Sequence, residues 1–186
     1  MSKKLVFVTG NMNKVHWLEK FLGQAVDHRK LDLIEIQSLD PVEVVRHKSI
    51  EAYGQIQEPV LIEDTSLVFT ALGKLPGTFV KFFLEEIGNA DMCRLLDGYT
   101  DKSATASVIY GIYDGKNFQS FGKSVEGSIS PEPKGASGHG WDPIFIPEGQ
   151  TKTYAEMTQG EYVTYSVRNK AVQKLKKFID EERGKI

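Results

Sequence analysis

The sequence predicts an α/β fold with a mixed β-sheet, and two observations support this class. Short apolar strands alternate with amphipathic helices through the first half of the chain. In the middle, two segments rich in β-branched and aromatic residues flank Asp114-Gly115-Lys116-Asn117, a sequence typical of a β-hairpin turn. Strands linked by helices favour parallel pairing whereas a hairpin is antiparallel, so both kinds of pair are expected in one sheet.

The first half is expected to contain three strands and two helices. The better defined helix begins after Asp40, because aspartate is a favoured N-cap, Pro41 suits the first helical position and Glu43 completes a capping-box arrangement. In order, we expect a strand over 4–8, a helix that Gly23 ends, a strand over 31–37, the helix 40–57, and a strand over 60–62 for which 67–69 is a candidate continuation.

The second half is expected to be more irregular. Apolar side chains recur at helical spacing from Phe79 to Ile87, and Gly88 follows them, which indicates a helix. Glycine, serine and proline are frequent over 127–140, so that segment should be an exposed loop. The other expected elements are a turn-rich loop over 73–77, a short helix over 90–97, hairpin strands over 104–113 and 118–125, a strand over 141–146 and a helix over 166–182.

Length and composition bound the class of protein. At roughly 150 residues per domain, 186 residues predict a single domain, residues 1–186. The 23 basic and 25 acidic residues give a net charge of −2, which offers no pervasive positive field for binding a nucleic acid. The apolar runs are far shorter than the ~18 residues of a membrane span. Cys93 is the only cysteine, fits a helical core pattern and cannot form an internal disulfide, so we expect a cytoplasmic location. Together with the charge balance and the short apolar runs, this predicts a soluble protein without nucleic-acid or membrane partners.

The segment from Thr9 to Lys14 joins a buried strand to a helix and has the features of a phosphate-binding turn. Backbone amides at a helix start carry partial positive charge, Gly10 permits close approach of the main chain, and Lys14 adds a cation. The alternative is an ordinary strand-to-helix turn with Asn11 as the helix cap. The pattern alone leaves both interpretations open.

Glu63 and Asp64 follow a buried strand, at the end where open α/β sheets place their ligands. Mg²⁺ is held in proteins by one or two carboxylates together with water and substrate phosphates. The acidic pair is therefore a candidate metal site, and a solvated strand end that turns into Thr65 is the alternative. Three further charged residues, taken singly, fit ordinary surface positions: Glu35, Lys48 and Lys81.

The segment from Gly138 to Pro143 combines a permissive glycine backbone with Trp141 and Asp142. An indole face can stack on a purine and a carboxylate can read its edge, so the segment is a candidate base pocket. Alternatively, Trp141 is a core anchor below a glycine-rich loop. A phosphate cradle, metal-binding carboxylates and a base-stacking loop in one chain together favour a nucleoside-triphosphate site.

Six motifs in a fixed order resemble those of the inosine triphosphate pyrophosphatase family, the non-canonical purine NTP pyrophosphatases. They are F-V-T-G-N-x-x-K, V-L-I-E-D-T, L-P-G-T-F-V-K-F-F, D-K-S-A, G-W-D-P-I-F and T-Y-A-E-M, and the resemblance extends from about Lys4 to Ile179. It implies an elongated mixed β-sheet flanked by helices in two lobes, with a central nucleotide cleft. It also implies Mg²⁺-dependent hydrolysis of ITP, dITP and XTP to the monophosphate and pyrophosphate by a homodimer, with Mn²⁺ as a substitute cation.

The resemblance also assigns roles residue by residue. Glu35 and Asp64 match metal ligands, and Asp64 matches the proposed base. The residues that we assign to catalysis are Asp64, Glu63 and Lys14. The residues expected to contact the substrate are Thr9, Gly10, Asn11, Lys14, Lys48, Thr65, Lys81, His139, Gly140, Trp141, Asp142 and Arg168.

Three positions depart from the family motifs. Val167 stands where the family has a histidine, Tyr162 where it has a lysine, and His139 where an aromatic residue precedes Gly-Trp-Asp. Arg168 can direct donors at the 6-oxo group of a purine, and a site built on such bonds rejects the wrong base. Without the family's histidine one donor is missing, at a cost of ~1–3 kcal/mol. We therefore expect weaker discrimination of ITP than in a typical member.

The resulting hypothesis is a metal-assisted hydrolysis. Glu35 and Asp64 hold Mg²⁺, with Glu63 in its inner or outer coordination sphere, and Asp64 or a neighbouring carboxylate orients water toward the α-phosphorus. The lysines at positions 14, 48 and 81 stabilise the leaving pyrophosphate. Two alternatives are a pyrophosphatase of the same family with another base preference, and a nucleotide-binding regulator with little catalysis.

Overall fold

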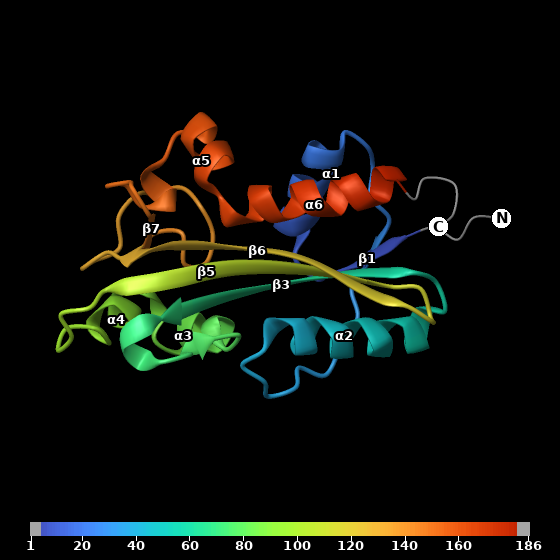
Figure 1. Ribbon diagram of the computed structural model, residues 1–186, viewed down its shortest axis with the longest axis horizontal. Helices are drawn as coiled ribbons and strands as arrows, with labels where there is room; N and C mark the ends of the chain where they lie inside the picture. Colours follow the sequence, from blue (N-terminus) through green and yellow to red (C-terminus); the bar gives the residue numbers. More distant parts are fainter. Residues whose placement is uncertain (1–4, 182–186) are drawn as a thin grey trace. The chain divides into compact units, whose positions relative to one another are not determined.

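The computed structural model describes residues 5–181, which form a seven-stranded sheet with helices on both faces (Figure 1). The strands are β1 (Val6–Val8), β2 (His28–Arg29), β3 (Val60–Phe69), β4 (Pro76–Gly77), β5 (Ser103–Tyr113), β6 (Phe118–Ile129) and β7 (Phe145–Pro147). The helices are α1 (Met12–Leu22), α2 (Pro41–Ile56), α3 (Val80–Glu86), α4 (Gly88–Arg94), α5 (Gln159–Tyr165) and α6 (Val167–Glu181), with 3₁₀ turns at Thr70–Leu72 and Tyr154–Glu156. Lys4 and Glu182, which end two expected elements, lie outside the described residues.

The sheet is mixed, as the sequence predicts. β1 pairs in parallel with β2 and with β3, whereas the β3–β4 and β6–β7 pairs are antiparallel. β5 and β6 are neighbours in the strand order β2-β1-β3-β5-β6-β7 and are joined by the expected turn. The Asp114 carboxylate accepts from the backbone N–H groups of Lys116 and Asn117, and the bond from Asn117 lowers its pKa. The α/β class and the hairpin are therefore confirmed.

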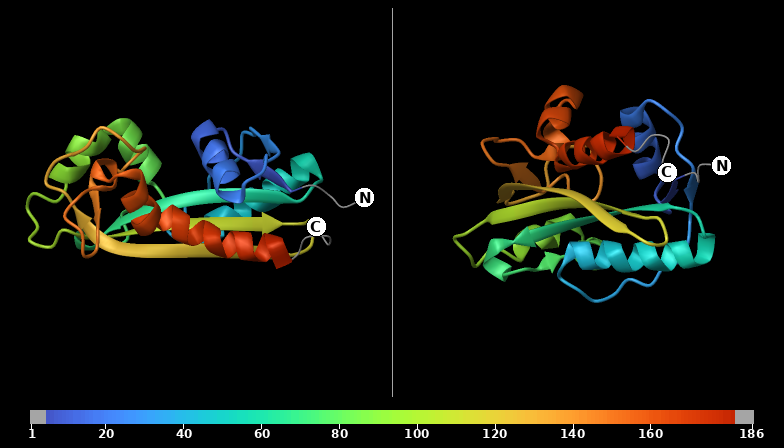
Figure 2. Two further views of the ribbon diagram at one scale, coloured as in Figure 1. Left: turned by 90° about the horizontal axis from the view of Figure 1, so that it is seen from above. Right: turned by 45° about the vertical axis from the view of Figure 1, so that its right-hand side comes forward.

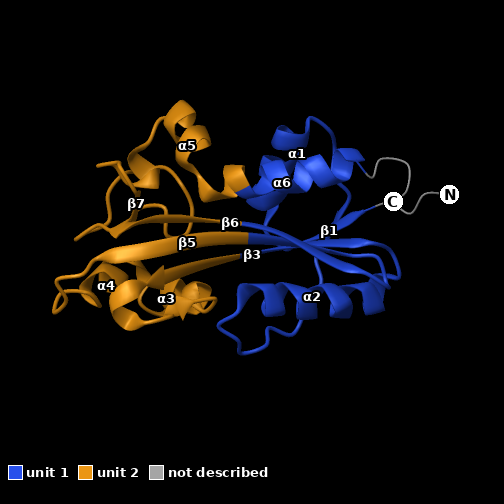
Figure 3. Ribbon diagram, viewed as in Figure 1, with its two compact units in different colours: residues 1–64, 109–122, 171–186 blue, residues 65–108, 123–170 orange. Residues whose placement is uncertain are grey.

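The chain divides into two compact units, which Figure 3 colours separately. Unit 1 comprises residues 1–64, 109–122 and 171–186, and unit 2 comprises residues 65–108 and 123–170. Three strands, β3, β5 and β6, and helix α6 contribute residues to both units.

In unit 1, α2 covers one face of the sheet, and α1 and α6 cover the other (Figure 1). Beneath α2, a cluster of buried side chains forms a core to which burial of each aliphatic side chain contributes about 1.5–3 kcal/mol. Its members are Val6, Val8, Val45, Ala52, Val60 and Ile62. The leucine of α6 that faces inward, Leu175, is fully buried.

The caps of α1 and α2 follow from the local sequence. Asn11 accepts from the backbone N–H of Asn13 at the start of α1, and Gly23 ends the helix in the left-handed conformation, with φ of 69°. At the start of α2, the Asp40 side chain accepts from the N–H of Val42 at 2.8 Å. Gln57 ends this helix, also with positive φ, as expected of the segment before Pro59.

The predicted strand over 31–37 is wrong, because the strand beside β1 is the short segment His28–Arg29. Leu31 and Leu33 still pack against the unit 1 core, which accounts for the alternating apolar pattern. The backbone N–H of Ile34, however, donates to the Glu51 carboxylate of α2 rather than to a neighbouring strand. The segment is therefore an extended loop, which the Glu51 side chain holds to α2.

In unit 2, α3 and α4 lie on one side of the strands and α5 lies on the other (Figure 2). Three buried rings of this unit, Trp141, Phe145 and Tyr154, form an aromatic cluster with centroids 5.3–6.1 Å apart. Aromatic contacts of this kind stabilise a fold beyond simple area burial, by about 0.5–1.5 kcal/mol each.

Several boundaries in unit 2 differ from expectation. The short helix lies over Gly88–Arg94 rather than 90–97, and Gly88, with φ of 69°, separates it from α3. The strand over 141–146 begins only at Phe145, because the preceding residues form turns closed by Asp142 N–H to the His139 carbonyl and Ile144 N–H to the Trp141 carbonyl. β6 continues to Ile129, so the exposed loop starts later than predicted.

Candidate active site

The acidic pair lies inside β3, which corrects its predicted place at a strand end. β3 continues to Phe69, and its register pairs Leu61 with β1 and Leu67 with β4. Residues 62–66 lie between these two sets of pairs, just beyond the last contact with β1. Glu63 and Asp64 therefore lie next to the carboxyl end of β1 and not at the carboxyl end of β3.

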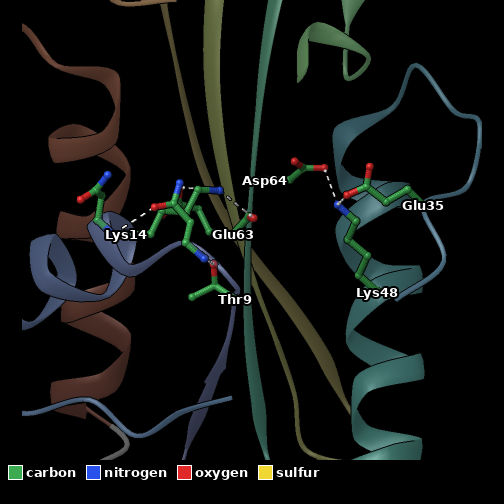
Figure 4. A network of polar contacts seen from close by, with 8 residues as sticks. Thr9, Lys14, Glu35, Lys48, Glu63 and Asp64 are labelled. Atoms are coloured by element: carbon green, nitrogen blue, oxygen red, sulfur yellow. Dashed lines mark hydrogen bonds and ion pairs between the residues drawn. The ribbon is translucent and has the colours of Figure 1, made fainter. Parts of the chain in front are cut away.

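Asp64 points to the face of β3 that α2 covers. There the Lys48 ammonium lies 2.8 Å from Glu35 Oε1 and 3.5 Å from Asp64 Oδ2 (Figure 4). The Lys48 side chain is only 11% exposed, whereas Asp64 and Glu35 are 18% and 40% exposed. One cation thus already lies between the two carboxylates that the sequence predicts as metal ligands.

Glu63 points to the opposite face, because successive side chains alternate along a strand. Its carboxylate is 1% exposed, and Oε1 lies 3.2 Å from the Lys14 ammonium of α1 (Figure 4). Lys14 also donates to the main-chain carbonyl of Glu63 at 3.5 Å. The structure therefore brings Lys14 to β3 as expected, but it separates Glu63 from the Glu35–Lys48–Asp64 group.

The loop between β1 and α1 is closed by its own side chains. Thr9 Oγ1 accepts from the N–H of Asn11 at 3.1 Å, and Asn11 Oδ1 accepts from the N–H of Asn13 at 3.0 Å. A Cβ at Gly10 would make ordinary contacts of 3.4 Å with the flexible Lys30 side chain. Packing within the fold therefore does not require a glycine at position 10.

Glu35 and Asp64 fit a Mg²⁺ ion by their chemistry. Both are partly exposed carboxylates that converge on a single cation, and Mg²⁺ uses one or two carboxylates with water and substrate phosphates for its remaining positions. Among residues 5–181, no group of three or more His, Cys, Asp or Glu side chains is arranged to hold a metal by itself. The two carboxylates suit a metal that is completed by substrate.

The glycine-rich segment of unit 2 is built around the buried Asp142. Its carboxylate accepts from the backbone N–H of His139 at 2.8 Å, and burial raises its pKa, while this bond, Arg168 and the His139 ring oppose the shift. Gly138 has φ of +89°, and a Cβ there would lie 2.8 Å from Asp142 Oδ2, so only glycine fits. His139 itself is exposed.

Trp141 is 8% exposed and packs on Phe145 and Tyr154, which favours the core-anchor alternative over base stacking. The other residues of unit 2 that the sequence assigns to substrate are spread over its elements. Lys81 is exposed on α3, Gly140 is exposed in the loop, Thr65 is partly exposed on β3, and Arg168 is partly exposed at the start of α6.

Two residues that shape this region were not predicted from the sequence. Asn89 of α4 donates from Nδ2 to the Gly140 carbonyl at 2.8 Å and so fastens the loop to a helix. The Tyr154 hydroxyl donates to the Tyr165 carbonyl and accepts from the N–H of Val167, which fixes the junction of α5 and α6 beside Arg168. No sequence signal identifies Asn89, whereas Tyr154 lies in the T-Y-A-E-M motif.

Two expectations about the rest of the chain can be compared with the structure. Cys93 is buried in α4, which confirms that it is a core residue, and burial raises the pKa of its thiol to about 11. No helix within residues 5–181 is long and apolar enough to cross a membrane.

The carboxylates and lysine of unit 1 are chemically suited to a phosphate ligand that carries a divalent cation. Comparisons with known proteins indicate the family. The Ham1 family profile matches residues 5–178. Similar solved structures include a HAM1 protein from Coxiella burnetii (23% identity, TM-score 0.83, 96% of this chain and 99% of the other) and the Staphylococcus aureus Ham1 protein (22%, 0.78, 96% and 100%).

A third similar structure is a nucleoside-triphosphatase, described as a dITP/XTP pyrophosphatase, from Mycobacterium abscessus (21% identity, TM-score 0.77, 92% of this chain and 98% of the other). The chain belongs to the Ham1 family. The resemblance inferred from the six sequence motifs is confirmed.

Proposed function

We propose that this enzyme hydrolyses non-canonical purine nucleoside triphosphates, ITP, dITP and XTP, to the monophosphate and pyrophosphate. The observation that carries the proposal is the convergence of Glu35 and Asp64 on the Lys48 ammonium in unit 1. Two carboxylates around one cationic position suit a metal that a triphosphate completes.

Positive charge for the phosphates comes from both sides of β3. Lys14, at the first turn of α1, and Lys48 of α2 are both largely buried, so their charges act in a medium less polar than water. Lys81 of unit 2 is exposed and is assigned to the same task. Thr9, Gly10 and Asn11 form the loop that the phosphates approach.

Mg²⁺, when bound to Glu35 and Asp64, supplies charge neutralisation at the triphosphate oxygens. Asp64 orients a water molecule and accepts its proton as the water oxygen attacks the α-phosphorus in line. The bond from the α-phosphorus to the bridging oxygen breaks, and pyrophosphate leaves. Lys14 and Lys48 stabilise the charge that develops on this leaving group.

Recognition of the base is assigned to unit 2. Arg168 directs donors at the 6-oxo group, and Asp142 holds the His139 loop in place through its bond to the backbone N–H. Trp141 supports the loop from within the aromatic cluster. Gly140 allows the main chain to approach the substrate closely, and Thr65 offers a hydroxyl group.

The second candidate function is hydrolysis of triphosphates with a different base, because three residues depart from the family motifs. Val167 is 2% exposed, so the position that carries a histidine in the family here presents a buried aliphatic group. His139 brings an exposed imidazole to the loop, and Tyr162 packs on Tyr154. The homodimer, the cytoplasmic location and the use of Mn²⁺ stay predictions.

The test is the release of pyrophosphate and of orthophosphate from ITP, XTP, dITP, GTP and ATP with Mg²⁺, and again with Mn²⁺. Pyrophosphate from the first three, well ahead of GTP and ATP, is expected. Comparable rates on all five would support the altered base preference. Orthophosphate as the first product, or binding without turnover, would contradict the proposal, and the latter outcome would indicate a nucleotide-binding regulator.

A further inference from the structure

Glu63 and Asp64 are adjacent in sequence but belong to different ionic groups. Asp64 lies with Glu35 and Lys48 on the α2 side of β3, and Glu63 lies with Lys14 on the α1 side (Figure 4). A metal held by Glu35 and Asp64 would have the strand itself between it and the Glu63 carboxylate. The position of Glu63 therefore does not suit a ligand of that metal.

Burial explains why Glu63 needs a cation. Its side chain is 1% exposed, and a carboxylate removed from water is strongly destabilised unless it is paired and hydrogen-bonded. Lys14 provides the opposite charge at 3.2 Å from Oε1. The pair is therefore a fixed feature of the fold rather than a solvated surface contact.

The same contact fixes Lys14. A lysine side chain has a flexible four-carbon stem, and its ammonium must be held for its charge to be preorganised. Both the carboxylate and the main-chain carbonyl of Glu63 approach the Lys14 ammonium, at 3.2 and 3.5 Å. The Lys14 side chain keeps 18% of its surface exposed, so part of it remains accessible to a ligand.

We propose that Glu63 is a positioning residue that acts on the triphosphate through Lys14, and that it is not a metal ligand. The proposal rests on the proposed function for the identity of the substrate. The Glu63 carboxylate holds the ammonium against β3, and the ammonium contacts the phosphates. Removal of the Glu63 charge should therefore lower activity much more while Lys14 is present than after Lys14 has been replaced.

A double-mutant cycle tests this dependence. Glu63→Gln keeps the shape of the side chain and removes its charge, and Lys14→Met removes the ammonium. We expect Glu63→Gln to lower kcat/KM by about tenfold in the wild-type background and by less than about twofold in the Lys14→Met background, since residues that act as one unit are not additive. Equal losses in both backgrounds would overturn the proposal.

Metal binding, measured without nucleotide or turnover, separates the two roles of an acidic residue. Titration with Mn²⁺, followed by calorimetry, should give the same Kd for Glu63→Gln and the wild-type protein. Glu35→Gln is the matched variant, and its Kd should rise by about tenfold or more because a ligand is lost. If Glu63→Gln weakened Mn²⁺ binding as much as Glu35→Gln does, Glu63 would be a ligand.

Two controls keep the outcome interpretable. Glu63→Asp retains the charge on a shorter stem and should recover part of the lost kcat/KM, and it replaces Glu63→Gln in the cycle if the latter does not fold. The cycle is repeated with the Kd for inorganic triphosphate as the readout. If the effects of the two substitutions on triphosphate binding are coupled but no nucleotide is turned over, the proposed function is contradicted and the positioning role stands. If their effects on triphosphate binding are additive, the positioning role is overturned.

Discussion

Lys14 and Lys48 approach β3 from opposite faces and meet different surroundings. Lys14 contacts the Glu63 carboxylate, which is almost entirely buried. Lys48 contacts the carboxylates of Glu35 and Asp64, which keep 40% and 18% of their side-chain surface exposed. A buried carboxylate holds its cation in place, whereas two partly exposed carboxylates can exchange one cation for another. We infer that the cation on the α1 face of β3, Lys14, is fixed, and that a metal can take the place of the cation on the α2 face, Lys48.

The largest expected effect is on the Asp64 face. Asp64→Asn should lower kcat by about 10³-fold, since a positioned base contributes about 10²–10⁴ to a rate. Its melting temperature should stay close to that of the wild-type protein, because the residue is partly exposed. Asp32→Asn, which changes an exposed acid in the loop that carries Glu35, is the matched control and should keep full activity. Near wild-type turnover of Asp64→Asn would remove Asp64 from the mechanism.

The next prediction compares the two lysines directly. Lys48→Met should tighten Mn²⁺ binding by on the order of tenfold, because a cation beside two carboxylates competes with the metal for them. Lys14→Met should leave the Kd for Mn²⁺ unchanged, since its partner is on the other face. Both variants should lose kcat/KM toward the triphosphate. Equal changes in Mn²⁺ affinity would mean that the faces are not independent.

A smaller effect is expected on selectivity. Val167→His should raise the ratio of kcat/KM for ITP over ATP by about tenfold, because a buried donor restored beside Arg168 is worth ~1–3 kcal/mol. The measurement is the ratio in the variant against the wild-type ratio. An unchanged ratio would show that position 167 does not take part in base selection.

The smallest effect concerns stability and pH in unit 2. The Lys152 ammonium and the N–H and hydroxyl groups of Thr158 lower the pKa of Glu161 to about 2. A depressed carboxyl pKa stabilises the fold above the unfolded value near 4.5, and this contribution is lost as the pH falls toward 2. Thermal unfolding of Glu161→Gln should therefore show a slightly lower melting temperature at pH 6, with the difference shrinking below pH 4.5. A difference that is constant with pH would exclude this cause.

The sequence was most informative where a local signal determines the structure. Asp40 before Pro41 marks the start of α2, and Asp114 through Asn117 mark the hairpin, because caps and turns are decided within a few residues. Thr158 and Glu161 form a capping box that starts α5, so this helix could also have been predicted.

Other features depend on contacts between distant residues and could not be predicted. The alternation over 31–37 is typical of a strand, but Glu51 accepts the backbone N–H of Ile34 and no strand forms. Whether Trp141 stacks on a ligand or packs inside depends on Phe145 and Tyr154. The separation of Glu63 from Asp64 follows from strand alternation, but only once β3 is known to continue past them.

The most direct test of the central claim is to follow the oxygen of the attacking water. Hydrolysis of ITP in ¹⁸O-labelled water should place the label in the monophosphate and none in pyrophosphate, because water oriented by Asp64 attacks the α-phosphorus. Label in pyrophosphate would mean attack on the β-phosphorus, and label in orthophosphate would mean attack on the γ-phosphorus. Either result would contradict the roles assigned here to the two faces of β3.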